Sequence, residues 1–391
     1  MYYYFIIIIF AKIHTMISNQ NPFITNGYLS NNYFCGRKTE KETLIRELTN
    51  GNNVALISTR RMGKTGLIMN CFESASIQKK YYTFFVDIYS TASMRDFVFL
   101  LSKAIIENLK PFGKRALQRF LECVKSIHAG LSFDITGTPK LTMGLGDIRS
   151  AEATLDEIFE YLNGADKPCI VAIDEFQQIA NYPEKNVESL LRTYLQRSKN
   201  AHFIFAGSQQ HFMGSMFLSP ARPFYQSVSI IHLDAIPLDE YSSFAIDLFK
   251  KGRKELLPET VESIYNKFDG ITWYLQKILH QLYNTTPNGE QCTENLVEPA
   301  VSAIIDSFKY PYSEILYRTP LKQKELLIAI AKEGAAESLT SSDFIRKHSL
   351  SSSSSVQAAL KALLEKDFVT RDEGIYRVYD RFFAIWLKEN Y

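Results

Sequence analysis

The segment Val54-Ala55-Leu56-Ile57-Ser58-Thr59-Arg60-Arg61-Met62-Gly63-Lys64-Thr65 decides the fold of this 391-residue chain. Its four apolar residues predict a buried strand, and the apolar spacing after Lys64 predicts a helix. Between them lies most of the pattern G-x-x-x-x-G-K-[ST], a turn whose backbone N–H groups hold the phosphates of ATP or GTP. We expect Lys64 to reach the β- and γ-phosphates and the Thr65 hydroxyl to bind Mg²⁺.

One position departs from this pattern, because Ser58 stands where the first glycine belongs. A residue with a Cβ atom restricts the backbone at that point. A Gly-Lys-Ser/Thr tripeptide also occurs often by chance, so the nucleotide prediction needs support from elsewhere in the chain.

Polar residues follow two further predicted strands. The apolar run 169–173 ends in Asp174-Glu175, and the run 201–207 is followed by Ser208. Because parallel strands place their carboxyl ends at one edge of a sheet, we expect these residues to lie near Lys64. Asp174 would then hold Mg²⁺, Glu175 would orient and deprotonate the attacking water, and Ser208 would contact the γ-phosphate. The alternative is that each residue only caps a following helix.

A third motif, Cys35-Gly36-Arg37-Lys38-Thr39-Glu40, precedes the first strand. With the RRxGKT turn and the Asp-Glu strand, it makes the chain resemble the prokaryotic AAA-like ATPase family, in the AAA+/STAND branch of P-loop NTPases, from about Tyr28 to the C-terminus. The resemblance implies ATP with Mg²⁺ and places Gly36, Arg37 and Glu40 near the adenine. The expected nucleotide-binding residues are therefore Gly36, Arg37, Glu40, Ser58, Thr59, Arg60, Arg61, Met62, Gly63, Lys64, Thr65, Gly66 and Ser208.

An arginine between two prolines, Arg222, is a candidate for stabilising the γ-phosphate, either in the same chain or in a neighbouring subunit. An ion pair with an acid of the core is an equal alternative. Arg60 and Arg61 in the turn are further candidates.

Composition bounds the class of protein and its partners. Hydrophobic residues make up 46% of the chain and charged residues 22%, which is ordinary for a globular protein of two or three domains. The net charge of +2 gives no overall attraction to nucleic acid or membrane, and the scattered cysteines favour a reducing cytoplasm. The apolar run from Tyr2 to Ala11 is too short to span a bilayer; we favour a start at Met16 over an edge strand or a membrane-dipping segment.

The predicted fold class is α/β, a doubly wound parallel sheet followed by a helical lid and a winged helix. The expected divisions are an N-terminal extension (1–27), an ATPase core (28–237), a helical lid (238–318) and a winged helix (319–391). A T-x-x-E capping box from Thr39 to Glu42 is expected to start the first helix of the core. A hairpin insertion at about 110–150, around a Gly137-Thr138-Pro139 turn, either docks a partner or another copy of the chain or is decoration.

The C-terminal pattern of three helices and a hairpin is that of a winged helix. From Leu321 to Tyr391 the net charge is only +1, which is faint for a DNA-binding surface. The favoured function is a slow ATPase that works as a nucleotide-dependent switch. An ATP-dependent DNA-binding initiator or regulator with little hydrolysis is the alternative, and a scaffold that binds no nucleotide is a third possibility.

Overall fold

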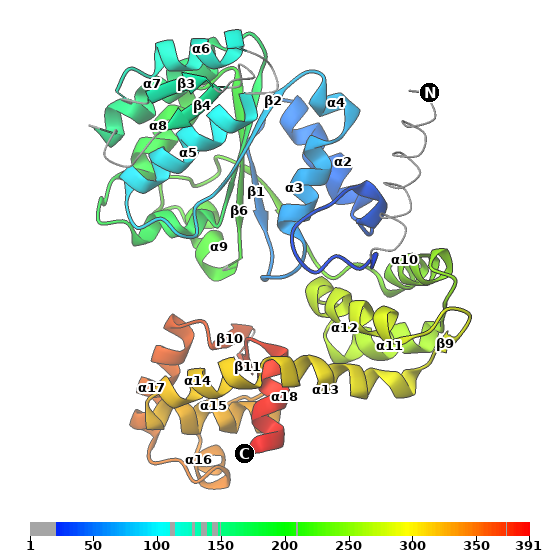
Figure 1. Cartoon of the computed structure of the whole chain (residues 1–391). Helices are drawn as coiled ribbons and strands as arrows, with labels where there is room; N and C mark the ends of the chain where they lie inside the picture. Colours follow the sequence, from blue (N-terminus) through cyan, green and yellow to red (C-terminus); the bar gives the residue numbers. More distant parts are fainter. Residues whose placement is uncertain are drawn as a thin grey trace. The chain divides into compact units, whose positions relative to one another are not determined.

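Five parallel strands form one sheet in the chain (Figure 1). The computed structural model describes residues 21–109, 114–126, 130–133, 139–142, 148, 150–208, 210–372 and 374–391. The strand order is β2 (Tyr82–Asp87), β5 (Cys169–Asp174), β6 (Ala201–Gly207), β1 (Val54–Ile57) and β7 (Ser229–His232). All neighbouring pairs are parallel, with Ala172 opposite Ile204 and Ile204 opposite Val54. The predicted parallel sheet is confirmed.

The described residues divide into two units. One, which we call the sheet unit, contains Pro22–Phe244 and Gly270–Tyr274; the other, the helical unit, contains Asn21, Ala245–Asp269 and Leu275–Tyr391. The helical elements that join the strands of the sheet unit are η1 (Asn31–Tyr33), α2 (Lys38–Thr49), α3 (Lys64–Phe72), α4 (Ala75–Gln78), α5 (Met94–Leu109), α6 (Lys114–Cys123), α7 (Ala151–Gly164), η4 (Phe176–Asn181), α8 (Val187–Arg197), α9 (Gln210–Leu218) and the start of α10 (Leu238–Lys251).

Helices cover both faces of the sheet, which explains why β1 is apolar throughout and β5 is apolar up to Asp174 (Figure 1). Successive residues of a strand point to opposite faces. In β1, Ala55 and Ile57 therefore join a core with side chains of α5, α7, α8 and α9, whereas Val54 and Leu56 join a second core with α2, α3 and α4. Burial on both sides holds the carboxyl ends of β1, β5 and β6 at one edge.

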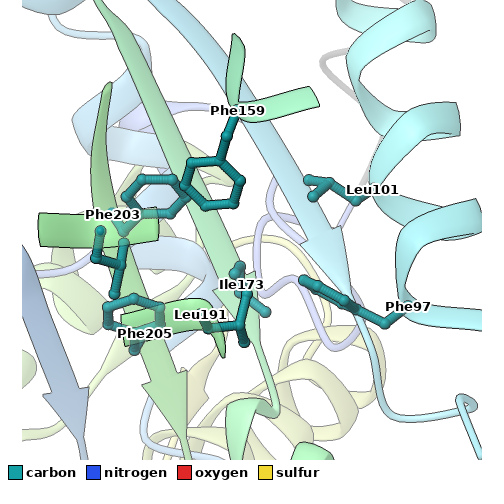
Figure 2. Close-up of a pocket in the computed structure, with 8 residues that line it drawn as sticks. Phe97, Leu101, Phe159, Ile173, Leu191, Phe203 and Phe205 are labelled. Atoms are coloured by element: carbon teal, nitrogen blue, oxygen red, sulfur yellow. The ribbon is translucent and has the colours of Figure 1, made fainter. Parts of the chain in front are cut away.

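A small cavity lies in the first of these two cores (Figure 2). Its eight lining residues, Phe97, Leu101, Phe159, Ile173, Leu191, Leu195, Phe203 and Phe205, are all apolar. A phosphate would lose its hydration there without gaining a donor or a cation. We therefore assign the cavity to core packing behind β5, and not to nucleotide binding.

The helical unit contains the rest of α10 and a short parallel pair, β8 (Glu255–Leu256) and β9 (Gln291–Cys292). Its helices before the winged helix are α11 (Pro258–Lys267), most of α12 (Thr272–Thr285), η5 (Glu294–Leu296), α13 (Val297–Ser307) and α14 (Lys309–Arg318). No helix among the described residues has the length and apolar content needed to cross a membrane.

The predicted winged helix is present. It consists of α15 (Leu321–Glu333), α16 (Ser342–Lys347), α17 (Ser353–Glu365) and an antiparallel hairpin of β10 (Val369–Asp372) and β11 (Ile375–Val378). A further helix, α18 (Arg381–Asn390), buries Phe382, Phe383 and Trp386 and packs on α15. That helix was not predicted, although its apolar residues recur at helical spacing.

Three details differ from the sequence expectations. The capping box at Thr39 is wrong, because α2 begins at Lys38, two residues before a helix capped by Thr39 would begin, and Arg37 occupies the N-cap position without a side-chain cap. The strands β7, β8 and β9 were not predicted, since each has only two to four residues. The insertion contains the expected hairpin, β3 (Gly130–Phe133) with β4 (Pro139–Thr142), and also α6. Residues 1–20 of the predicted extension, and Gly137 and Thr138 of the predicted turn, lie outside the described residues.

Glycine 207, the last residue of β6, supports a test of this packing. A Cβ atom there would lie 2.5 Å from Met213 Sδ and 2.6 Å from Gln177 Oε1. We expect Gly207→Ala to lower the free energy of unfolding by about 1–3 kcal/mol, because a buried overlap forces side chains out of their packed positions. The measurement is urea denaturation followed by far-UV circular dichroism.

The matched control for this substitution is Gly214→Ala in the middle of α9, where an added Cβ would meet no heavy atom within 4 Å. It should raise stability by up to about 1 kcal/mol, because alanine favours a helix over glycine. Equal stabilities for the two variants would contradict the packing described for Gly207.

Candidate functional site

The turn between β1 and α3 has the backbone of an anion-binding loop. Arg61 and Gly63 adopt left-handed conformations, with φ of 69° and 92°. A Cβ on Gly63 would meet no heavy atom within 4 Å, so this glycine serves the backbone conformation and not close packing. Such turns point N–H groups to one side, and α3 starts directly after this one. The turn and the N-terminus of α3 together form a site that suits a phosphate.

Ser58 fits this loop without strain. It is completely buried and its φ is not positive, so the position does not need glycine. Its hydroxyl donates to the Thr59 carbonyl at 2.8 Å and lies 3.1 Å from Lys64 Nζ. The substitution that weakened the motif in the sequence therefore supplies an extra acceptor for the lysine.

Lys64 is folded back against the loop. Its ammonium donates to the Ser58 and Thr59 carbonyls at 3.3 and 3.2 Å. Burial lowers the pKa of Lys64 to about 8, against the attraction of Asp174 and Glu175. An anion in the loop would compensate for this lost hydration, so the ammonium is suited to bind phosphate.

Asp174 and Thr65 form the second part of the site. The Thr65 hydroxyl donates to Asp174 Oδ2 at 2.6 Å, and the Glu175 N–H donates to Oδ1 at 3.0 Å. Burial raises the pKa of the Asp174 carboxyl. A hydroxyl and a carboxylate beside a phosphate loop are the oxygen ligands that Mg²⁺ takes together with phosphate and water, so the residues fit this ion.

Glu175 is held by a chain of hydrogen bonds. Its Oε2 accepts from the Ser208 hydroxyl at 2.9 Å and from Gln177 Nε2 at 2.5 Å. Arg60 Nε donates to the same serine oxygen at 3.1 Å. The carboxylates at the end of β5, the serine after β6 and the loop arginine therefore form one network.

Gln177 was missed by sequence reasoning. It lies only two residues after Glu175, beyond the end of β5, and a helix does not bring side chains at this separation together. Glu175 has a left-handed φ of 57°, which turns the chain directly into η4. Phe176 then anchors that turn, with its ring buried 4.4 Å from Phe205 between centroids. A polar residue shortly after an Asp-Glu pair is the only signal that the sequence offers.

The upstream segment contacts the loop through Arg37. Its guanidinium donates to the Met62 carbonyl at 3.2 Å and pairs with Glu40 at 2.8 Å. Gly36 has a φ of +64°, and a Cβ there would lie 3.0 Å from Glu240 Oε2. The three residues are thus fixed beside the loop; their contact with adenine stays a prediction.

The three candidate arginines contact different parts of the structure. Arg60 belongs to the Glu175 network, and Arg61 points instead to Trp273 and Tyr274. Arg222 forms an ion pair of 2.5 Å with Glu188 of α8, as in the alternative left open by the sequence. Burial raises the pKa of Glu188 even beside this arginine. The structure therefore brings Lys64, Thr65, Asp174, Glu175, Ser208 and Arg60 together, and leaves Arg222 bound elsewhere.

The parallel sheet, the loop and the acids at the strand ends define a P-loop nucleoside triphosphatase fold. Comparison with protein families agrees with this class. The chain belongs to the family described as "ATPase domain predominantly from Archaea", whose model matches residues 35–278. A second model, described as "Probable winged helix domain", matches residues 310–389.

Solved structures with the same fold cover nearly the whole chain. The Walker-type ATPase of Pyrococcus abyssi is 17% identical with a TM-score of 0.64, over 94% of this chain and 99% of that one. The ORC2 protein of Aeropyrum pernix, solved in ADPNP-ADP complexes, is 15% identical with a TM-score of 0.60, over 95% and 96%. The ORC1 protein of Aeropyrum pernix, solved in complex with DNA, is 14% identical with a TM-score of 0.51, over 91% and 93%. At these identities the likeness establishes the fold alone. The comparison with curated proteins gives no match.

The lowered pKa of Lys64 gives a pH test of the site without nucleotide. Between the folded pKa of about 8 and the ordinary value of 10.5, the unfolded chain binds more protons than the folded chain. The free energy of unfolding should therefore rise with pH across this window, by up to about 3 kcal/mol from this group. In Lys64→Met the rise in the free energy of unfolding should be smaller by this amount. Urea denaturation from pH 7 to 10.5 measures the rise in both proteins.

Tyrosines and cysteines also titrate in this window, so the quantity that decides is the difference between the two proteins. Lys41→Met, on a different helix, is the control and should follow the wild type. Parallel curves for wild type and Lys64→Met would show that Lys64 keeps an ordinary pKa.

Proposed function

We propose that the protein binds ATP with Mg²⁺ and hydrolyses its γ-phosphate slowly, using the difference between its ATP and ADP states as a conformational signal. The observation that carries this proposal is the position of Glu175. It lies beside the Asp174–Thr65 pair and is held by Ser208 and Gln177 at the edge that Lys64 shares. A scaffold that only binds phosphate has no use for a second acid held in this way.

Each residue has a role that its contacts support. The loop amides and Lys64 would bind the β- and γ-phosphates, and Glu175 would orient a water and accept its proton. Thr65 and Asp174 would hold Mg²⁺, which when bound neutralises charge that develops on the phosphates. Arg60 lies in the network of the acid and is the better placed of the arginines to stabilise this charge in the same chain.

The contacts of Glu175 support slow turnover. Its Oε2 accepts two hydrogen bonds, from Ser208 and Gln177, which fix the orientation of the carboxylate. A carboxylate has acceptor sites on both oxygens, so Oε1 is the atom left to accept a bond from the attacking water. Any turn of the carboxylate toward that water requires the Ser208 and Gln177 side chains to move with it, which suits a switch better than a rapid enzyme.

Two substitutions separate binding from hydrolysis. Glu175→Gln keeps the shape of the side chain but cannot accept a proton, so kcat for ATP should fall by about 10²-fold or more while ATP still binds. Lys64→Ala should weaken ATP binding itself. Phosphate release and isothermal calorimetry measure the two properties. Hydrolysis by Glu175→Gln at the wild-type rate would remove Glu175 from the mechanism.

A third substitution tests the contact that the sequence did not predict. Gln177→Leu removes the donor to Glu175 and fills a similar volume. If Gln177 restrains the acid, this variant should change kcat severalfold with little change in the affinity for ATP. The control is Gln178→Leu, because Gln178 donates to the Thr91 carbonyl and not to the acid.

A protein without nucleotide binding is the simplest alternative. A ligand at about a hundred times its Kd stabilises the folded state by roughly 2.7 kcal/mol. Mg-ATP should therefore raise the melting temperature of the wild type and not that of Lys64→Ala. The absence of any shift in the wild type would favour the scaffold.

The second candidate function is ATP-dependent DNA binding through the winged helix, favoured by the winged-helix match over residues 310–389. DNA binding should weaken steeply as salt rises, because bound phosphates release counterions. Fluorescence anisotropy with a labelled duplex, with and without Mg-ATP, tests this function. A partner protein, or a second copy of the chain reached by Arg222, also remains a proposal; light scattering with and without nucleotide addresses the second copy.

A further inference from the structure

Arg61 of the phosphate loop contacts the first turn of α12. The α12 N-terminus contains no arginine, so the lid has no cation of its own there to sense phosphate. Instead, the phosphate loop supplies the cation, and that cation lies against aromatic side chains of α12. The Arg61 guanidinium lies 4.2 Å from the ring centroid of Trp273 and 5.1 Å from that of Tyr274, and it donates to the Tyr274 hydroxyl.

The backbone adds a second link. The Trp273 N–H donates to the Arg61 carbonyl at 3.1 Å. The first N–H groups of a helix have no partner inside the helix. Here the phosphate loop supplies one, so Arg61 satisfies the start of α12 with its carbonyl and covers its aromatic side chains with its guanidinium.

The aromatic side of the contact is fixed independently. The Trp273 indole N–H donates to the Thr25 carbonyl at 3.2 Å, and Tyr274 is only 1% exposed. Gly270–Tyr274 belongs to the sheet unit although the chain on either side of it belongs to the helical unit. α12 therefore starts in one unit and continues in the other.

A change in the loop must reach this contact. Arg61 has a left-handed φ of 69°, and the planar peptide bond fixes the direction of its carbonyl relative to the Met62 N–H. The Met62 N–H is among the groups that bind phosphate in a loop of this kind. An adjustment of the loop to a γ-phosphate therefore rotates the carbonyl that holds Trp273.

We infer that Arg61 is a positioning residue that transmits the nucleotide state from the phosphate loop to the first turn of α12, through Trp273 and Tyr274. The inference rests on the proposed nucleotide binding and adds the route by which it is sensed. In this inference Arg61 responds to the nucleotide through the shape of the phosphate loop, and it does not contact phosphate itself.

Tryptophan fluorescence tests this inference, because the chain has only two tryptophans. In Trp386→Phe, Trp273 is the sole emitter. Its emission should change in a saturable way with a non-cleavable ATP analogue and Mg²⁺, at the concentration that calorimetry gives for binding, and by a different amount with Mg-ADP. In the same background, Arg61→Ala and Tyr274→Phe should reduce the difference between the two nucleotides by about threefold or more.

A readout that a purely structural contact would not move is the ratio of Kd values for ADP and the ATP analogue. Arg61→Ala should change this ratio by about threefold while binding persists. Arg46→Ala, an arginine with a side chain 61% exposed on α2, is the control for the lost charge and should leave the ratio unchanged. Circular dichroism confirms folding, and Tyr274→Phe supports the test if Arg61→Ala does not fold.

Each outcome bears on the inference. Calorimetric binding without a change in Trp273 emission overturns it and leaves the proposed function intact. An equal loss of affinity for both nucleotides in Arg61→Ala also overturns it, because Arg61 would then be a phosphate ligand. If neither nucleotide binds the wild type, the proposed function and this inference fail together.

Discussion

The shape of the phosphate loop is the constraint on which the rest of the site depends. Three successive residues fix it to three different segments. Arg60 donates to Ser208 after β6, the Arg61 carbonyl accepts from Trp273, and the Met62 carbonyl accepts from Arg37. Because these bonds use side chains and carbonyls, they leave the loop N–H groups outside this set of contacts. The loop keeps its shape without using the groups that a phosphate needs.

Sequence reasoning located the edge of the sheet but not the contacts along it. Hydrophobic runs ending in Asp174-Glu175 and in Ser208 predicted the right strands, since burial on both faces leaves little choice of pattern. Which polar groups meet depends on turns of one or two residues. The left-handed turn at Glu175 brings Gln177 onto the acid, and no periodicity encodes it. For the same reason the capping box at Thr39 was wrong, because a left-handed Arg37 starts the helix earlier.

Local structure also explains why Ser58, Arg222 and the short strands were hard to interpret from the sequence. Ser58 looked like a defect because the pattern records residue types, whereas the loop needs a positive φ only at Arg61 and Gly63. For Arg222 the sequence left a phosphate contact and an ion pair as equal alternatives, because Glu188 lies 14 residues after Asp174 and could not be paired with the arginine by spacing. Short strands such as β7 were missed because four residues carry too little pattern.

Buried charge explains why these contacts form a connected site. Lys64 and Asp174 are both buried. Burial lowers the pKa of Lys64 and raises that of Asp174, which in each case favours the neutral form. Their mutual attraction offsets only part of this cost, since neither is directly hydrogen-bonded to the other in the contacts that hold them. A phosphate beside the ammonium and a cation beside the carboxylate would each favour the charged form of its neighbour. A nucleotide with its metal ion would therefore relieve the cost of burial at both residues, and this supports the proposed binding at this edge of the sheet.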